Sequence, residues 1–240
     1  MSSSYVGASA TKKKKGKEQE DSGITSHKDI EGFEQWINEK DAADLAADAY
    51  LKTSVGEKVN GWTIIDSIDD KKTGFKAKLY EKDGNHVFAT AGTNPWSGKD
   101  WANNIAQQFG WNSKQYNQSI ELAKEYAGKY DNLVFVGHSL GGGLASANSC
   151  ATGCSAITFN AAALSSKYNL GKNSKIVAYI SDGDILDYAN EVLLRQKVEG
   201  EIIRRSVPAS NLPNLQGIPL TGIYQAIRGV IAHRDYAFTN

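Results

Sequence analysis

The sequence has no excess of charge of either sign, no long apolar run and few cysteines, and each absence excludes a class of protein. Its 240 residues include 27 Lys and Arg and 27 Asp and Glu. This balance argues against nucleic acid as a partner, because phosphate binding requires surplus basic side chains. No run approaches the ~18 apolar residues of a membrane-spanning helix. Two cysteines can form neither a disulfide framework nor a four-ligand zinc site. The composition, 40% hydrophobic and 22% charged, is that of a globular protein.

The first 25 residues are polar and contain the lysine cluster Lys12–Lys15. Few of them are large and apolar, so nothing drives their packing. We therefore predict a disordered Lys-rich tail over residues 1–25 and a single folded domain over residues 26–240. No apolar stretch follows the lysines, so the segment is not predicted to be a cleaved secretory signal peptide. The alternative interpretations are an export address or a contact with anionic lipid, and the acidic residues that follow weaken the second.

The spacing of apolar residues further along predicts an α/β fold. Ile30, Phe33, Trp36 and Ile37 recur at helical spacing, and residues 45–50 repeat this pattern in a second helix. Strands then alternate with helices, which indicates a mostly parallel central sheet with helices on both faces. An Asp-Gly-Asn turn predicts an antiparallel hairpin at the N-terminal side of this sheet. The other predicted elements are strands at 62–65, 74–80, 86–90, 133–136, 156–159 and 175–180, and a helix at 113–130.

The strongest chemical signal is the motif Gly137-His138-Ser139-Leu140-Gly141, which lies between an apolar strand and a stretch of small residues. A serine hydroxyl becomes nucleophilic when a sharp turn exposes it to a base, and glycines on both sides let the strand and the following helix approach. The N-terminus of that helix supplies backbone N–H groups for an oxyanion. The alternative is a structural glycine-rich turn whose serine caps the helix.

A catalytic serine of this kind needs a histidine later in the chain. His233 is the only histidine after Ser139, and it is therefore the predicted base. His138 occupies the variable position of the motif and is interpreted as a packing or hydrogen-bonding residue. His27 and His86 precede the serine and are interpreted as surface or strand-end residues.

The acid that orients the histidine should follow a later strand. Asp184 is the preferred candidate and Asp182 the second, because both follow the strand predicted at 175–180. A calcium site in the same carboxylate cluster is the alternative, although no complete ligand loop is present. A second oxyanion donor is expected in the loop 91–94, where Thr93 offers both an N–H and a hydroxyl. A plain turn is the alternative there.

Several of these segments together resemble the class 3 lipase branch of the α/β hydrolases, and more specifically the bacterial phospholipase A1 proteins exported without a cleaved signal peptide. The resemblance covers roughly residues 40–240. It rests on Ala91-Gly92-Thr93, Asp100-Trp101, Asn103-Asn104, GHSLGGGLAS from Gly137, Thr158-Phe159-Asn160-Ala161, Gly183-Asp184 and His233.

This resemblance implies an α/β-hydrolase fold with a triad of Ser139, Asp184 and His233. It also implies that Thr93 and Leu140 donate the oxyanion hydrogen bonds. In one departure, the family's usual Phe-Arg-Gly-Thr is replaced here by Thr-Ala-Gly-Thr at 90–93, so any anchoring by that arginine is lost.

Substrate contacts are expected from apolar residues near the oxyanion loop. Trp96 and Trp101 are the predicted substrate-binding residues, in a region where a lid could close over an acyl chain. A second apolar stretch, residues 215–231, leads up to His233. Both stretches also suit the protein's own core. Cys150 and Cys154 are interpreted as small buried residues, with a short disulfide as the alternative.

The predicted function is hydrolysis of lipid acyl esters, with the sn-1 ester of glycerophospholipids as the expected substrate and no metal or cofactor required. Triacylglycerol lipase or short-chain carboxylesterase activity is the alternative on the same machinery. A catalytically silent module that binds lipid or protein is the alternative of another class. The expected partners are a phospholipid membrane surface and a cognate immunity or chaperone protein, with no nucleic acid. Secretion as an effector without a classical signal peptide is expected, with a cytoplasmic location as the alternative.

Overall fold

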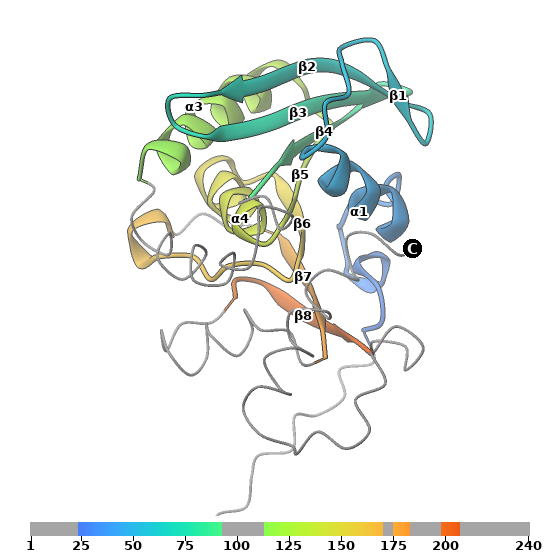
Figure 1. Ribbon diagram of the computed structural model, residues 1–240. Coiled ribbons are helices and arrows are strands. Elements are labelled where there is room, and N and C mark those ends of the chain that lie inside the picture. The colour runs from blue at the N-terminus through green and yellow to red at the C-terminus, as the bar shows by residue number, and fades with distance from the viewer. Residues whose placement is uncertain (1–23, 93–112, 170–174, 183–197, 207–240) are drawn as a thin grey trace, which may run out of the picture.

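Figure 1 shows the computed structural model of the chain, in which residues 24–92, 113–169, 175–182 and 198–206 are described. These residues form a central β-sheet covered by helices. The helices are η1 (His27–Asp29), α1 (Glu39–Asp48), α3 (Ser113–Lys129), α4 (Leu140–Thr152) and η2 (Ser166–Tyr168). The strands are β1 (Lys58–Val59), β2 (Trp62–Asp70), β3 (Phe75–Lys82), β4 (Asn85–Thr90), β5 (Leu133–His138), β6 (Ser155–Phe159), β7 (Ile176–Ser181) and β8 (Glu201–Arg205).

The strands lie in the sheet in the order of the chain, and their directions divide it into two parts. From β1 to β4, neighbouring strands are antiparallel, and from β4 to β8 they are parallel. The β3–β4 hairpin turns at Asp83 and Gly84, both with positive φ, as a two-residue hairpin turn requires. This architecture confirms the predicted α/β class, its N-terminal hairpin and its mostly parallel sheet.

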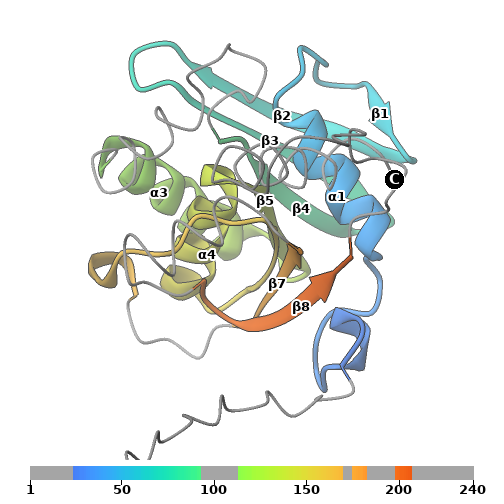
Figure 2. The ribbon, with the colours of Figure 1, turned by 60° about the horizontal axis from the view of Figure 1, so that its bottom comes forward.

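The helices cover both faces of the sheet. In Figure 2, α1 crosses one face, and α3 and α4 lie against the other. Strand β5 packs against the helices on both sides of the sheet, because both of its faces are buried. Val134 and Val136 belong to the apolar cluster under α1, whereas Leu133 and Phe135 belong to the cluster under α3 and α4. Buried faces on both sides explain why this strand reads as a continuous apolar run.

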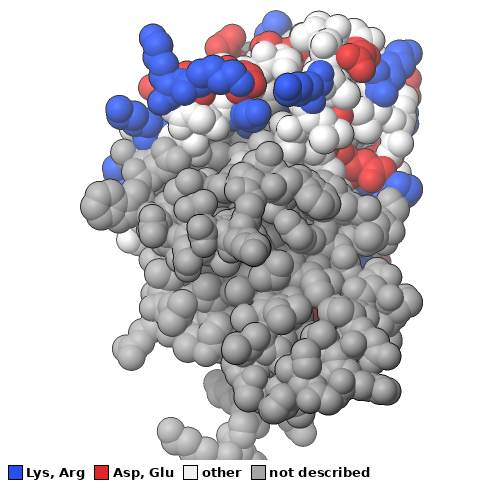
Figure 3. Space-filling view, viewed as in Figure 1, with Lys and Arg blue, Asp and Glu red and all other residues white. Residues whose placement is uncertain are grey.

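The described part of the surface carries charges of both signs. In Figure 3, Lys and Arg side chains stand beside Asp and Glu side chains over β2 and β3 at the top of the view. Lys71 and Lys76, for example, both pair with Asp69. In the part of the chain that the structure describes, no helix is long and apolar enough to cross a membrane.

The helix predicted over Ile30–Ile37 is wrong. After the single turn of η1, the chain continues as turns and bends, and Gly32 adopts a left-handed φ of +69° that interrupts any helix. Phe33 and Ile37 are nevertheless buried in the cluster under α1, so their spacing reflects burial rather than a helix. The second predicted helix is confirmed as α1, whose N-cap Asn38 accepts a hydrogen bond from the Asp41 N–H.

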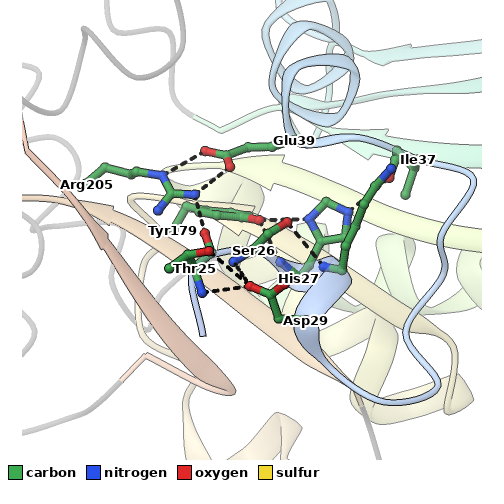
Figure 4. Close-up of polar contacts among 9 residues, drawn as sticks. Thr25, Ser26, His27, Asp29, Ile37, Glu39, Tyr179 and Arg205 are labelled. Atoms are coloured by element: carbon green, nitrogen blue, oxygen red, sulfur yellow. Dashed lines mark hydrogen bonds and ion pairs between the residues drawn. The ribbon is translucent and has the colours of Figure 1, made fainter. Parts of the chain in front are cut away.

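The N-terminal described segment is held to β7 by buried polar contacts of His27 and to β8 by more exposed contacts of Arg205 (Figure 4). His27 lies beneath the surface, where its Nε2 is 3.0 Å from the Ile37 carbonyl oxygen and its Nδ1 is 2.8 Å from the Tyr179 hydroxyl. Arg205 pairs with Glu39 at 2.7 Å and also donates to the Thr25 carbonyl. The interpretation of His27 as a surface or strand-end residue was therefore wrong. Its contacts hold the end of β7, the strand that leads toward Asp182.

Candidate active site

Ser139 occupies a sharp turn between β5 and α4. Its φ of 60° and ψ of −128° are unusual for a residue other than glycine, and a strained serine at this junction is the geometry of a nucleophile elbow. The side chain is buried, and its Oγ has no hydrogen-bond partner among the residues that the structure describes. Although Ser139 precedes α4, its side chain makes no capping hydrogen bond, which argues against the structural alternative.

The glycines on either side of Ser139 make the close approach of strand and helix feasible. A Cβ atom on Gly137 would overlap the carbonyl of Gly141, and a Cβ on Gly141 would overlap the carbonyl oxygen of Thr90. One residue further on, a Cβ on Gly142 would lie 2.6 Å from the Cβ of Ala161. The small residues of the motif are therefore required by contacts with β4 and with the segment after β6.

Hydrogen bonds to β4, to β6 and to the segment after β6 hold this turn in place. The Ser139 N–H donates to the Phe159 carbonyl over 3.1 Å, and the Ala162 N–H donates to the Ser139 carbonyl over 2.9 Å. The Thr90 hydroxyl donates to the Gly141 carbonyl over 2.7 Å. The strained backbone of Ser139 is thus determined by its surroundings, as is typical of functional sites.

Two backbone N–H groups at the start of α4 point to an anion site beside the serine. Neither Leu140 N–H nor Gly141 N–H has an acceptor within the described ranges. Gly92, two residues after the end of β4, packs directly against them. A Cβ on Gly92 would lie 2.9 Å from both nitrogen atoms, so only glycine leaves this space open. Unpaired N–H groups at a helix N-terminus can stabilise a developing oxyanion.

Tyr50, just beyond the end of α1, reaches the same place. Its hydroxyl accepts a hydrogen bond from the Gly92 N–H at 2.9 Å and donates to the His138 carbonyl at 3.0 Å. His138 is fully buried with its ring beside that of Tyr50, which confirms its interpretation as a packing and hydrogen-bonding residue. Sequence reasoning missed Tyr50 because its place in the apolar pattern of residues 45–50 indicated only a core residue.

The structure describes two of the predicted site residues, Ser139 and Leu140, and the second-choice acid, Asp182. Ser139 and Leu140 lie together at the elbow. Asp182 follows β7 with an exposed side chain, which accepts a hydrogen bond from the Ser206 hydroxyl at 3.2 Å. The other residues for which predictions were made lie outside the described residues. They are residues 1–23 of the predicted tail 1–25, Thr93, Trp96, Trp101, Asp184 with the rest of the carboxylate cluster after Asp182, the stretch 215–231 and His233.

The remaining histidine and the two cysteines belong to the framework. His86 lies near the start of β4 and stacks on Tyr130 with ring centroids 3.8 Å apart, consistent with a strand-end residue. Cys150 is buried on α4, and Cys154 packs against the same cluster. The interpretation as small buried residues is confirmed for Cys150, whereas Cys154 is only partly buried.

Comparison with protein families gives a match to the phospholipase-like family, described as the Tle-like phospholipase domain, over residues 40–233. The chain belongs to this family. Membership confirms the resemblance to lipases and phospholipases drawn from the motifs, and the matched residues span the elbow and reach His233.

One curated relative and two solved structures are similar to this phospholipase-like chain. The chain is 47% identical over 100 residues to an extracellular phospholipase A1 of Serratia liquefaciens, a match that covers 41% of this chain and about a third (31%) of that protein. A triacylglycerol lipase of Penicillium expansum superposes with a TM-score of 0.53 at 20% identity, covering 70% of this chain and 78% of the lipase. A fungal lipase–inhibitor complex gives 0.51 at 12% identity, covering 68% and 77%. These two structures confirm the α/β-hydrolase fold.

Proposed function

We propose that this phospholipase-like chain is a serine hydrolase that cleaves acyl esters of lipids, acting as a phospholipase A1 on glycerophospholipids. The single observation that carries the proposal is the elbow at Ser139. Its Oγ is unpartnered among the described residues, its backbone φ is +60°, and two unpaired N–H groups lie beside it. The family match over residues 40–233 supports the same chemistry.

In the proposed mechanism, His233 accepts the proton of Ser139 as Oγ attacks the ester carbonyl. The carbonyl oxygen becomes an oxyanion, which the backbone N–H groups of Leu140 and Thr93 stabilise. His233 then returns the proton to the departing lysophospholipid alcohol, leaving an acyl group on Ser139. A water molecule, deprotonated by His233, releases the fatty acid and restores the serine. Asp184 orients the imidazole and stabilises its protonated form.

Asp184 remains our proposed acid in preference to Asp182. The Asp182 carboxylate is exposed and accepts a hydrogen bond from Ser206, next to the end of β8. Its backbone N–H also extends the β7–β8 ladder by donating to the Arg205 carbonyl over 2.8 Å. Both contacts hold Asp182 beside β8. This strand lies on the side of β7 that faces away from the elbow strand β5.

The test is fatty-acid release from vesicles of phosphatidylcholine and phosphatidylglycerol by the full chain. Ser139→Ala, His233→Ala, Asp184→Asn and Asp182→Asn are assayed beside it, with tributyrin and a short p-nitrophenyl ester as further substrates. We expect the first two variants to lose about 10³-fold or more in kcat and Asp184→Asn to lose more than Asp182→Asn. The position of the released acyl chain distinguishes the sn-1 ester from the sn-2 ester.

Other outcomes redirect the proposal in defined ways. Activity on the short ester or tributyrin alone would identify a carboxylesterase or triacylglycerol lipase on the same machinery. Activity equal in the Ser139→Ala and unmodified proteins would overturn the catalytic role of the elbow. The silent lipid- or protein-binding module would then take its place.

We further propose that Trp96 and Trp101 contact the acyl chain.

We also propose that the protein is a secreted effector acting on membranes. The relative from Serratia liquefaciens, which is described as extracellular, supports this proposal of secretion. Directing the protein to the periplasm of a bacterial host should slow growth, and Ser139→Ala should abolish the effect. A cognate immunity or chaperone protein would restore growth when co-produced. Equal growth with both variants would contradict the effector role.

A further inference from the structure

The Tyr50 hydroxyl connects two chain segments that border the proposed oxyanion site. One of its hydrogen bonds reaches the carbonyl of His138, in the peptide group that precedes Ser139, over 3.0 Å. A second comes from the N–H of Gly92, one residue before Thr93, over 2.9 Å, and the His138 Nδ1 lies 3.5 Å from the same hydroxyl. These contacts span 88 and 42 positions of the sequence, so this one hydroxyl brings β5, β4 and α1 to a common point.

The roles of donor and acceptor in this arrangement follow from chemistry. A carbonyl oxygen only accepts, so the single hydroxyl proton of Tyr50 is directed at His138. The Gly92 N–H only donates, and it therefore uses a lone pair of the same oxygen. Burial raises the pKa of the Tyr50 hydroxyl, so the proton that this geometry needs remains in place at neutral pH. The Tyr50 hydroxyl therefore uses its proton in a hydrogen bond within the protein. It influences the reaction only by holding the backbone in place.

Tyr50 also stands beside the space that Gly92 leaves open. A Cβ on Gly92 would lie 3.0 Å from the Tyr50 hydroxyl and 2.9 Å from Leu140 N. The hydroxyl and the first N–H of α4 therefore border the same gap. A shift of Gly92 relative to Leu140 would alter this gap directly, and small displacements of oxyanion donors are costly to rate.

A buried ion pair holds the chain on both sides of Tyr50. Lys78 donates to the carbonyl of Asp48 over 2.7 Å and to the carbonyl of Leu51 over 3.2 Å. The same ammonium group lies 3.0 Å from the Asp48 carboxylate, and both side chains are nearly inaccessible to water. The Tyr80 hydroxyl donates to that carboxylate over 2.7 Å. Tyr50 therefore projects from a rigid support.

We propose that Tyr50 is a positioning residue that sets the separation between Gly92 and the elbow, and thereby the space beside the Leu140 N–H in which the oxyanion is proposed to form. This inference rests on the proposed function of Ser139. It predicts that the hydroxyl contributes to the transition state and little to substrate binding, because the oxyanion exists only after attack.

The experiment compares hydrolysis of p-nitrophenyl butyrate by the unmodified protein, Tyr50→Phe and Tyr126→Phe. Tyr126 is a matched control, since it is buried on α3 and donates its hydroxyl proton to Asp66 over 2.6 Å on the opposite face of the sheet. We expect Tyr50→Phe to lower kcat about 10-fold with KM changed less than twofold, and to weaken inhibition by butylboronic acid by about the same factor. Tyr126→Phe should keep the unmodified kcat.

Equal kcat in Tyr50→Phe and the unmodified protein would overturn the proposal, as would equal losses in both tyrosine variants. Ser139→Ala, assayed in parallel, tests the proposed function separately. Should it retain full activity, amide hydrogen exchange of Gly92 measured by NMR decides the role of Tyr50. Faster exchange in Tyr50→Phe than in Tyr126→Phe supports positioning, and equal exchange refutes it.

Discussion

The elbow at Ser139 and the support beneath α1 achieve rigidity by opposite means. At the elbow, glycines and backbone hydrogen bonds bring β4, β5 and α4 so close that side chains are excluded. Beneath α1, charged and polar side chains are buried and bind one another, as in the cluster of Lys78, Asp48 and Tyr80. Ser139 is thus held mainly by contacts between backbone atoms. Tyr50, which holds the segments around Ser139, is itself held by contacts between buried side chains.

The largest expected effect comes from breaking the support. Lys78→Met leaves the Asp48 carboxylate buried without its cation, and breaking a buried pair costs about 3–5 kcal/mol of unfolding free energy. Urea denaturation measures this loss. Lys76→Met is the control on the same strand, because its pair with Asp69 is exposed and should contribute less than about 1 kcal/mol. Losses of similar size in both variants would show that the buried pair has no special role.

The elbow should respond almost as strongly to a single methyl group. Gly141→Ala places a Cβ against the Thr90 carbonyl and should lower the unfolding free energy by about 3 kcal/mol, at the upper end for overpacking. Gly128→Ala on α3 is the control, since its Cβ meets nothing within 4 Å and should stabilise the helix by about 0.5–1 kcal/mol. Thermal unfolding of the two variants would contradict the comparison if both were destabilised alike.

Gly92→Ala sharpens the comparison by separating rate from stability. The new Cβ would lie 2.9 Å from the Leu140 and Gly141 nitrogen atoms, beside the Leu140 N–H that is proposed to bind the oxyanion. We expect kcat on a short ester to fall about 100-fold, as when an oxyanion donor is removed. Steady-state kinetics of this variant beside Gly128→Ala provide the measurement. An unchanged kcat would place the oxyanion elsewhere.

The smallest expected effect concerns His27 and pH. The Ile37 carbonyl can only accept, so Nε2 carries the proton and Nδ1 accepts from the Tyr179 hydroxyl, a pattern that suits the neutral ring. Burial, as the largest cause, lowers the pKa of His27 in the folded protein; the nearby Lys28 lowers it further, whereas the hydrogen bond to the Ile37 carbonyl and the Glu39 carboxylate partly oppose the shift.

Between this lowered pKa and the unfolded value of about 6.5, the unfolded chain binds more protons than the folded one. Stability should therefore rise with pH in this window, by at most about 1.4 kcal/mol per pH unit. His27→Gln should flatten the dependence measured by urea denaturation at several pH values. Burial also lowers the pKa of His86, so a residual slope of the same sign is expected. A slope identical to that of the unmodified protein would exclude His27 as its source.

Local signals in the sequence predicted the features that depend on neighbours along the chain. The motif around Ser139 predicted the elbow because its glycines act within a few residues of the serine. The Asp83–Gly84 turn predicted the hairpin because positive φ is a local requirement. The helix expected over Ile30–Ile37 failed because burial under α1 imitates helical spacing, while Gly32 breaks the helix.

Fold class, family and candidate nucleophile were therefore determined by the sequence alone, since strand alternation, turn residues and the elbow motif are local patterns. Only the tertiary structure decided that His27 is buried, that Lys78 and Asp48 pair beneath α1, and that Tyr50 joins His138 to Gly92. Each of these contacts connects residues 30 or more positions apart. A polar side chain looks the same in the sequence whether it faces water or a distant partner, and folding alone brings that partner within hydrogen-bond distance.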